Sequence, residues 1–384
     1  MNNFIETKRY KIKLLSPLHI GTGNKIPFFM IYCGGGYCYI FNEIKFGEEL
    51  SKRGPQIVDR FIQFSSRERG QLSDFIKEIF RGNTKGLNDF VEKTKAYKIK
   101  ARQLPQREII PFVRNSSFQP FVPGTSIKGA LRTAIMYSML KKMEKPHRER
   151  ILVDYVRDKI ESLQDRIKRG EKVQFYKEEK YFDKDLEVKL MWEYSLSENT
   201  TKFDPHTDIM RAVKISDTQP LDPDIAVLEE VEVYTGNFAT GIKIYAETLP
   251  EGTELEFSIT FNLHLFDRIR RHTSNKFELA IEEITEIARN PLETLNTWAS
   301  DLLEYERKNS KNQIIYSFRE EPNLNLGWGG GLLTKTVDLF LPESLRAELL
   351  SFFKRRKAYM PAPASRKLTS SNRPMGWCKV EKLQ

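Results

Sequence analysis

Residues 123–132 read Pro-Gly-Thr-Ser-Ile-Lys-Gly-Ala-Leu-Arg and join an extended segment to a helix through a glycine and two hydroxyl residues. Thr125 or Ser126 can cap that helix by accepting a hydrogen bond from a first-turn amide. The remaining free amides and the positive end of the helix dipole attract an anion. Lys128 and Arg132 are four residues apart and therefore lie on one helical face. The stretch predicts a place where a phosphate is held.

The helix that follows is predicted to be amphipathic, with a core stripe opposite its basic face. That stripe consists of Ile127, Leu131, Ala134, Ile135 and Ser138. Capped helices with a basic outer face are also common in proteins that bind no anion there. On these residues alone, a phosphate site and an ordinary helix start both remain open.

A second glycine-rich element lies near the C-terminus, where residues 326–331 read Leu-Gly-Trp-Gly-Gly-Gly. Glycines permit positive backbone torsions and let the main chain approach a ligand closely. The indole of Trp328 offers a flat surface on which a base could stack. The alternative is a tight turn with the tryptophan as a core residue.

Together with an N-terminal segment, these two elements resemble the RAMP superfamily, the RNA-binding proteins of CRISPR systems. Residues 12–23 (Ile-Lys-Leu-Leu-Ser-Pro-Leu-His-Ile-Gly-Thr-Gly) resemble its opening strand and turn, residues 121–129 its helix-start motif, and residues 326–331 its C-terminal glycine-rich loop. Their order and spacing and the chain length most resemble the family of fifth subunits of type III-A, or Csm, effector complexes. The resemblance implies two ferredoxin-like, RNA-recognition-type domains.

Length and periodicity predict an α+β protein with two domains, residues 1–249 and 250–384, because 384 residues are too many for one ordinary core. Strands are expected at residues 5–16, 28–32, 37–41, 213–215, 227–234, 242–247, 253–265, 314–318 and 375–380, the last at a sheet edge. Helices are expected at 43–80, 125–143, 151–167, 274–289, 291–308 and 345–353. Residues 171–207 are charged and irregular, and the tail from 361 to 374 is predicted to be loose.

The segment from about residue 227 to 247 predicts a long β-hairpin with a glycine-bearing tip. By resemblance it occupies the position of the thumb, a hairpin with which RAMP backbone subunits interrupt the duplex of guide and target. The thumb residues are then Tyr234, Asn237 and Phe238. A hairpin packed in a sheet is the alternative.

The chain carries 62 Lys and Arg against 52 Asp and Glu, a net charge of +10. Such a surplus favours a polyanionic partner, usually nucleic acid, although a generically solvated basic surface is the alternative. The basic residues cluster at 98–107, 141–150, 268–271 and 354–357.

Cys33, Cys38 and Cys378 contain no CxxC pair and are odd in number, so we expect neither a disulfide framework nor a closed zinc site. That usage indicates a reducing, cytoplasmic environment. The N-terminus lacks the apolar region of a signal peptide, and no window approaches the roughly 18 unbroken apolar residues of a membrane helix. We expect a soluble protein without a membrane partner.

Most catalytic motifs that could be expected are not matched by this sequence. Gly129 is followed by Ala130 and Leu131, not by the Lys-Ser/Thr of a nucleotide-binding loop, and no cofactor is expected. The run at 204–208 offers two carboxylates and an imidazole but reads as a solvated turn, so no metal is expected. The slicing backbone subunit of the family has a catalytic aspartate in the loop after its first strand, whereas residues 24–32 contain no acidic residue.

The resemblance implies a non-catalytic RNA-binding subunit that caps the 3′-end side of the CRISPR RNA and supports its maturation. Its partners would be CRISPR RNA and target RNA, the neighbouring Csm backbone subunit, the small subunits and a separate host nuclease that trims the guide. The expected RNA-binding residues are His19, Gly21, Gly23, Gly124, Thr125, Ser126, Lys128, Arg132, Gly327, Trp328, Gly329 and Gly330.

Two alternatives stay open. One is a metal-independent RAMP endoribonuclease that processes repeat RNA, with His19 as general base toward a 2′-hydroxyl. The other is a protein-interaction scaffold that makes no RNA contact. His19 could instead hydrogen-bond the turn beside it or contact the sugar-phosphate backbone.

Overall fold

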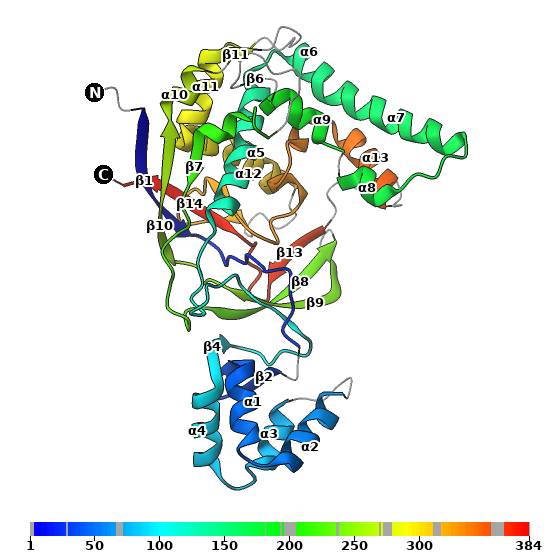
Figure 1. Ribbon diagram of the computed structural model, residues 1–384. Helices are drawn as coiled ribbons and strands as arrows, with labels where there is room; N and C mark the ends of the chain where they lie inside the picture. Colours follow the sequence, from blue (N-terminus) through cyan, green and yellow to red (C-terminus); the bar gives the residue numbers. More distant parts are fainter. Residues whose placement is uncertain are drawn as a thin grey trace.

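The computed structural model describes residues 4–27, 30–66, 72–180, 182–192, 194–195, 205–235, 238–268, 270–271, 279–309, 316–354 and 365–383. A main body of sheets and helices is joined to a smaller helical lobe that contains α1 to α4 (Figure 1). The first and last strands lie together on one side of the main body (Figure 1).

A five-stranded sheet in the main body has the order β12-β14-β1-β10-β7. Its strands are β1 (Ile5–Leu14), β7 (Val213–Ile215), β10 (Glu254–Asn262), β12 (Leu324–Asn325) and β14 (Trp377–Lys382). The alternation predicted for residues 253–265 is confirmed in β10, because Leu255, Phe257, Ile259 and Phe261 are all buried. The expectation that the last strand lies at an edge is wrong, since β14 pairs with both β1 and β12.

Helices α5 (Gly124–Lys142), α10 (Leu263–Asp267), α11 (Ile281–Arg289) and α12 (Pro291–Asn309) contribute to the core on one face of this sheet. Tyr10 on β1, Ile127 on α5 and Trp298 on α12 all belong to that core. β1 also pairs with β10 and β14, which lie in the predicted second domain. The predicted boundary at 249/250 stays a prediction.

The second sheet has seven strands in the order β2-β3-β4-β8-β9-β5, with β13 paired to β8 outside that path. They are β2 (Ile31–Gly34), β3 (Tyr37–Phe41), β4 (Lys95–Ala101), β5 (Ile109–Ile110), β8 (Val227–Thr235), β9 (Phe238–Thr248) and β13 (Ser365–Thr369). A separate pair joins β6 (Tyr194–Ser195) and β11 (Arg270–Arg271). The α+β class is confirmed; the ferredoxin-like form of the domains stays a prediction.

The small lobe replaces the single helical stretch expected at 43–80 by α1 (Glu43–Ser51), α2 (Pro55–Ser65) and α3 (Leu72–Ile79), with α4 (Thr84–Thr94) added. The proline at the first position of α2 suits a helix start. Its core consists largely of phenylalanines, including Phe41, Phe46, Phe75, Phe80 and Phe90.

A disulfide joins Cys33 to Cys38, so the expectation of none is wrong. The two residues are directly paired across the hairpin of β2 and β3, with Cα atoms 4.1 Å apart. Spacing rules such as CxxC do not detect this pair because strand pairing, not sequence distance, brings the thiols together. Cys378 is free and buried.

The described residues between 171 and 207 are more regular than expected. They include α8 (Phe175–Lys180), α9 (Lys184–Glu187) and a π-helical turn (Val188–Trp192), and Leu186, Leu190 and Met191 enter the main core. Within the tail predicted to be loose, residues 365–369 form β13, and residues 361–364 lie outside the described residues. Residues 316–318 form no strand, and the rest of the strand expected at 314–318 lies outside the described residues.

The remaining helices are α6 (Lys145–Arg148), α7 (Tyr155–Lys168), which a π-helical turn precedes, and α13 (Glu343–Lys354). In the part of the chain that the structure describes, no helix combines the length and the apolar composition that crossing a bilayer requires.

Candidate nucleic-acid interface

His19 lies in the loop after β1 and is 2% exposed. Its Nδ1 is 2.6 Å from the carbonyl oxygen of Glu247, to which it donates, and its ring meets Phe112 and Trp328 edge-on. Burial lowers the pKa of the imidazole, so the neutral form is favoured. A general base that takes the proton of a 2′-hydroxyl must be accessible to the substrate. His19 is therefore a buried residue on which the neighbouring loops pack, which we call the His19 floor. It is not an exposed base.

The glycine-rich loop (residues 326–331) docks on that floor. The amide of Trp328 donates to the carbonyl oxygen of His19 over 2.8 Å. Gly327 has φ +68°, and a Cβ there would come 2.1 Å from the same oxygen. Only glycine fits this position. The first and third motifs predicted from the sequence are thus brought together.

Three successive amides of the glycine-rich loop, those of Gly329, Gly330 and Gly331, have no hydrogen-bond acceptor in the described chain. All three residues are partly exposed. Successive main-chain N–H groups in a loop with positive φ values form anion-binding concavities. The exposed Gly21 and Gly23 lie in the turn after His19, and Gly21 bridges to Phe112. The loop can therefore offer donors to a phosphate without any charged side chain of its own.

Trp328 is half-buried and packs on Val231, Ala246 and Met375. The ammonium of Lys367 lies over its ring, 5.2 Å from the centroid. One face of the indole is thus covered by a cation, which leaves less room for base stacking than the sequence suggested. Lys367 was not among the predicted site residues because it lies in the tail that was expected to be loose.

The start of α5 differs from the prediction. Pro123 is the residue that precedes the helix, and neither Thr125 nor Ser126 caps it. The amide of Gly124 donates instead to the Asp217 carboxylate over 2.7 Å. A Cβ at Gly124 would come 2.4 Å from the carbonyl oxygen of Ile215, so this glycine admits the protein's own backbone. The first amide of the helix is therefore bound by a carboxylate of the same chain, and a phosphate site at residues 123–132 stays a prediction.

The basic face predicted on α5 is also satisfied internally. Arg132 pairs with Glu187 and Asp208, each at 2.6 Å. Lys128 donates to the carbonyl oxygen of Val213 over 2.8 Å, and burial lowers its pKa. The opposite stripe is buried as predicted. Thr125 is exposed, but the charged groups of Lys128 and Arg132 are both engaged by groups of the same chain.

Asp208 belongs to the run at 204–208 that was read as a solvated turn. It is 8% exposed and accepts hydrogen bonds from Met210 and Trp192 in addition to the ion pair with Arg132. Asp204 lies outside the described residues. Among the residues that are described, no group of three or more His, Cys, Asp or Glu could hold a metal ion.

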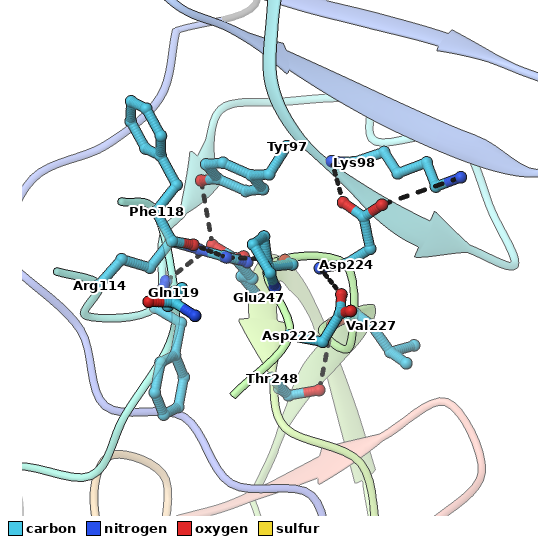
Figure 2. Close-up of polar contacts among 12 residues, drawn as sticks. Tyr97, Lys98, Arg114, Phe118, Gln119, Asp222, Asp224, Val227, Glu247 and Thr248 are labelled. Atoms are coloured by element: carbon cyan, nitrogen blue, oxygen red, sulfur yellow. Dashed lines mark hydrogen bonds and ion pairs between the residues drawn. The ribbon is translucent and has the colours of Figure 1, made fainter. Parts of the chain in front are cut away.

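Arg114 and Glu247 form a buried ion pair (Figure 2). Glu247 is fully buried and accepts hydrogen bonds from Arg114, from the amide of Phe112 at 2.9 Å and from Tyr97 at 3.4 Å. Arg114 also donates to the carbonyl oxygen of Phe118 and stacks 3.7 Å from the Tyr97 ring centroid. Since Glu247 also supplies the carbonyl that holds His19, this network positions the floor of the glycine-rich loop.

The hairpin of β8 and β9 forms as predicted, but it is not a free two-stranded projection. β13 pairs with β8 from Thr369 to Ser365, up to the residue beside the tip (Figure 1). Phe238 is 81% exposed and Tyr234 is half-buried, whereas Asn237 lies outside the described residues. A thumb role therefore stays a prediction.

The open face of the five-stranded sheet is neutralised by cross-strand ion pairs. Arg9 pairs with Glu256 at 2.5 Å and Lys11 pairs with Glu254 at 3.2 Å. RNA-recognition folds read bases with aromatic residues on such a face. Because these cations of β1 are paired with glutamates of β10, this face does not offer a row of free positive charges to an RNA backbone.

Comparison with known proteins gives consistent results. A model of the RAMP superfamily matches residues 11–334. The chain is similar to the CRISPR system Cms protein Csm5 of Streptococcus thermophilus, 23% identical over 278 residues, which covers 68% of this chain and 65% of that protein. It is also similar to Csm5 of Methanocaldococcus jannaschii, 22% identical over 346 residues, or 86% of this chain and 73% of that one.

Two solved structures share the fold. A chain of a Csm–crRNA–target RNA ternary complex from a type III-A CRISPR-Cas system, solved by cryo-electron microscopy, matches with a TM-score of 0.69 and 22% identity over 98% of this chain and 100% of its own length. The crystal structure of T. onnurineus Csm5 matches with a TM-score of 0.60 and 18% identity over 96% and 99%.

Proposed function

Since the chain belongs to the RAMP superfamily, we propose that it is an RNA-binding subunit of a type III-A Csm effector complex. Two findings support this: the similarity to Csm5 proteins, and the fold shared with a chain of a Csm–crRNA–target RNA complex. In such a particle it caps the 3′-end side of the CRISPR RNA, supports its maturation in antiviral defence and leaves cleavage to other subunits.

The observation that carries the proposal is that the amides of Gly329, Gly330 and Gly331, beside Trp328, have no acceptor among the residues that the structure describes. Backbone amides bind phosphate oxygens, which every nucleotide offers. Contacts of this kind position an RNA strand without reading its sequence. A guide that differs in every particle can therefore be held by one protein surface.

The proposed partners follow from the same assignment. CRISPR RNA binds at the glycine-rich loop, and target RNA meets the exposed Phe238 on the hairpin of β8 and β9. The neighbouring Csm backbone subunit and the small subunits contact the rest of the surface. A host nuclease that trims the guide is recruited to the end that this subunit covers.

A salt titration with labelled guide RNA tests the function. We expect affinity to fall by roughly tenfold or more between about 50 and about 200 mM salt, with little dependence on guide sequence, because released counterions drive the binding. Affinity that does not change with salt would contradict the phosphate-contact mechanism. Absence of any RNA binding would favour a protein scaffold.

Incubation with repeat RNA in EDTA separates the binder from a metal-independent endoribonuclease. We expect the RNA to stay intact, because the candidate base His19 is buried. Cleavage by the wild-type chain that disappears in His19→Ala would overturn the assignment and establish the enzyme.

A further inference from the structure

Lys367 on β13 is a half-buried cation without a counter-charge in the described chain. Its ammonium lies 5.2 Å from the ring centroid of Trp328 and makes no ion pair or hydrogen bond with any described group. Burial lowers its pKa, and no carboxylate of the described part of the chain offsets that effect. A cation held in this way is stabilised when an anion reaches it.

Three other cations of this region have partners. Arg366, the preceding residue on β13, donates to the buried Glu306 over 2.9 Å. Lys243 on β9 pairs with Glu230 at 2.7 Å. Lys335, just after the glycine-rich loop, donates to the carbonyl oxygen of Asn325. Lys367 differs from these three because its ammonium has no such partner among the described residues.

The position of Lys367 is fixed by its surroundings. The strand pairing sets it opposite Val233 on β8, and the Trp328 ring beneath it packs on Val231, Ala246 and Met375. A cation over an indole face is attracted by the ring and is held in place without being neutralised. The ammonium thus lies against Trp328, the residue next to Gly329, Gly330 and Gly331, whose amides have no acceptor in the described chain.

We propose that Lys367 is a phosphate-binding residue, which together with the amides of the glycine-rich loop receives a phosphodiester group of the RNA backbone. This rests on the proposed RNA-binding function and specifies the residue that supplies the charge. Trp328 acts in it as the support that orients the ammonium, not as a stacking surface for a base. The contact is independent of sequence because every nucleotide carries the same group.

The test compares Lys367→Met with Lys11→Met in full-length protein, using single-stranded guide RNA over a salt series. Lys11 is also a partly buried strand lysine, but it pairs with Glu254 on the open sheet face, so it controls for the loss of one positive charge. Loss of one phosphate contact should lower the slope of log affinity against log salt by about 0.7. We expect a three- to tenfold loss of affinity for Lys367→Met, less than twofold for Lys11→Met, and partial rescue by Lys367→Arg.

The outcomes separate the two proposals. If the wild-type protein does not bind RNA, the proposed function fails. If it binds and Lys367→Met keeps both the affinity and the salt slope, only the role of Lys367 is overturned. If Lys367→Met binds RNA normally but no longer assembles with its neighbouring subunit, the anion is an acidic protein side chain and the phosphate assignment is wrong. Lys367→Gln repeats the measurement if the methionine variant does not fold.

Discussion

At the start of α5 the first amide is bound by a carboxylate of the same chain, whereas three successive amides of the glycine-rich loop have no acceptor among the described residues. Both regions show glycine at a bend with a basic residue nearby in space. In the first, Arg132 is neutralised by Glu187 and Asp208. In the second, Lys367 has no carboxylate partner in the described chain.

The difference shows that a glycine motif has two uses. Gly124 lets the backbone at Ile215 come close and so closes a contact within the protein. Gly327 lets the glycine-rich loop approach the His19 carbonyl closely, and the amides of the glycines after Trp328 have no acceptor among the described residues. Free donors, not glycine content, distinguish a surface that can bind a phosphate from one that completes the fold.

Alanine substitution of the two anchoring glycines gives the largest expected effect. Gly327→Ala should lower the free energy of unfolding by about 2–5 kcal/mol, because a Cβ would meet the His19 carbonyl and the backbone has positive φ. Gly124→Ala should lower it by about 1–3 kcal/mol through crowding alone. Urea unfolding measures both. Gly129→Ala, at an exposed helical site with open space, should raise stability by up to about 1 kcal/mol. Equal and negligible effects at all three positions would contradict these packing assignments.

Removal of the guanidinium on α5 tests whether that region is structural. Arg132→Ala leaves Asp208, which is 8% exposed, without its cation, and we expect a loss of about 2–3 kcal/mol of stability. RNA affinity of the folded variant should change by less than about twofold, the limit of one distant charge in 0.15 M salt. The reverse pattern, unchanged stability with a large loss of RNA affinity, would show that α5 is a binding surface after all.

The carboxylate at the start of α5 gives a smaller effect. Asp217→Ala removes the acceptor of the Gly124 amide and should cost about 1 kcal/mol of stability. Because the neighbouring cations stay paired, the freed helix start should not gain RNA affinity. A several-fold gain in a filter-binding assay would mean that this carboxylate competes with RNA for the site.

The last effect is confined to acidic pH and concerns His19, on which the glycine-rich loop packs. Burial lowers the pKa of His19 in the folded state, so the unfolded chain binds a proton first as pH falls through about 6.5. Its contribution to stability is complete above that pH and should decrease by up to about 1.4 kcal/mol per pH unit below it. Urea unfolding at pH 7 and pH 5.5 should show a steeper decrease for the wild type than for His19→Gln. Parallel decreases would exclude His19 as the cause.

Much of the fold can be predicted from local patterns in the sequence. The alternation in 253–265 predicts β10, and the apolar stripe that begins at Ile127 predicts the buried face of α5. Each is a periodicity within about twenty residues. Such signals report which side of an element is buried.

Partners far apart in sequence could not be predicted in this way. Asp217 is 93 positions from the amide it binds, and Glu187 comes from a segment that was read as irregular. Lys367 meets Trp328 only because β13 pairs with β8. Neither charge nor periodicity in the sequence shows which cations are paired with a carboxylate in the fold. That pairing is what distinguishes the start of α5 from the glycine-rich loop.

Ultraviolet crosslinking of guide RNA to the assembled particle, followed by mass spectrometry of the peptides, shows which of the two glycine motifs meets the RNA. We expect crosslinked peptides from the glycine-rich loop around Trp328 and from β13 around Lys367, and none from residues 123–132. Crosslinks concentrated at residues 123–132, with the glycine-rich loop unlabelled, would contradict this expectation.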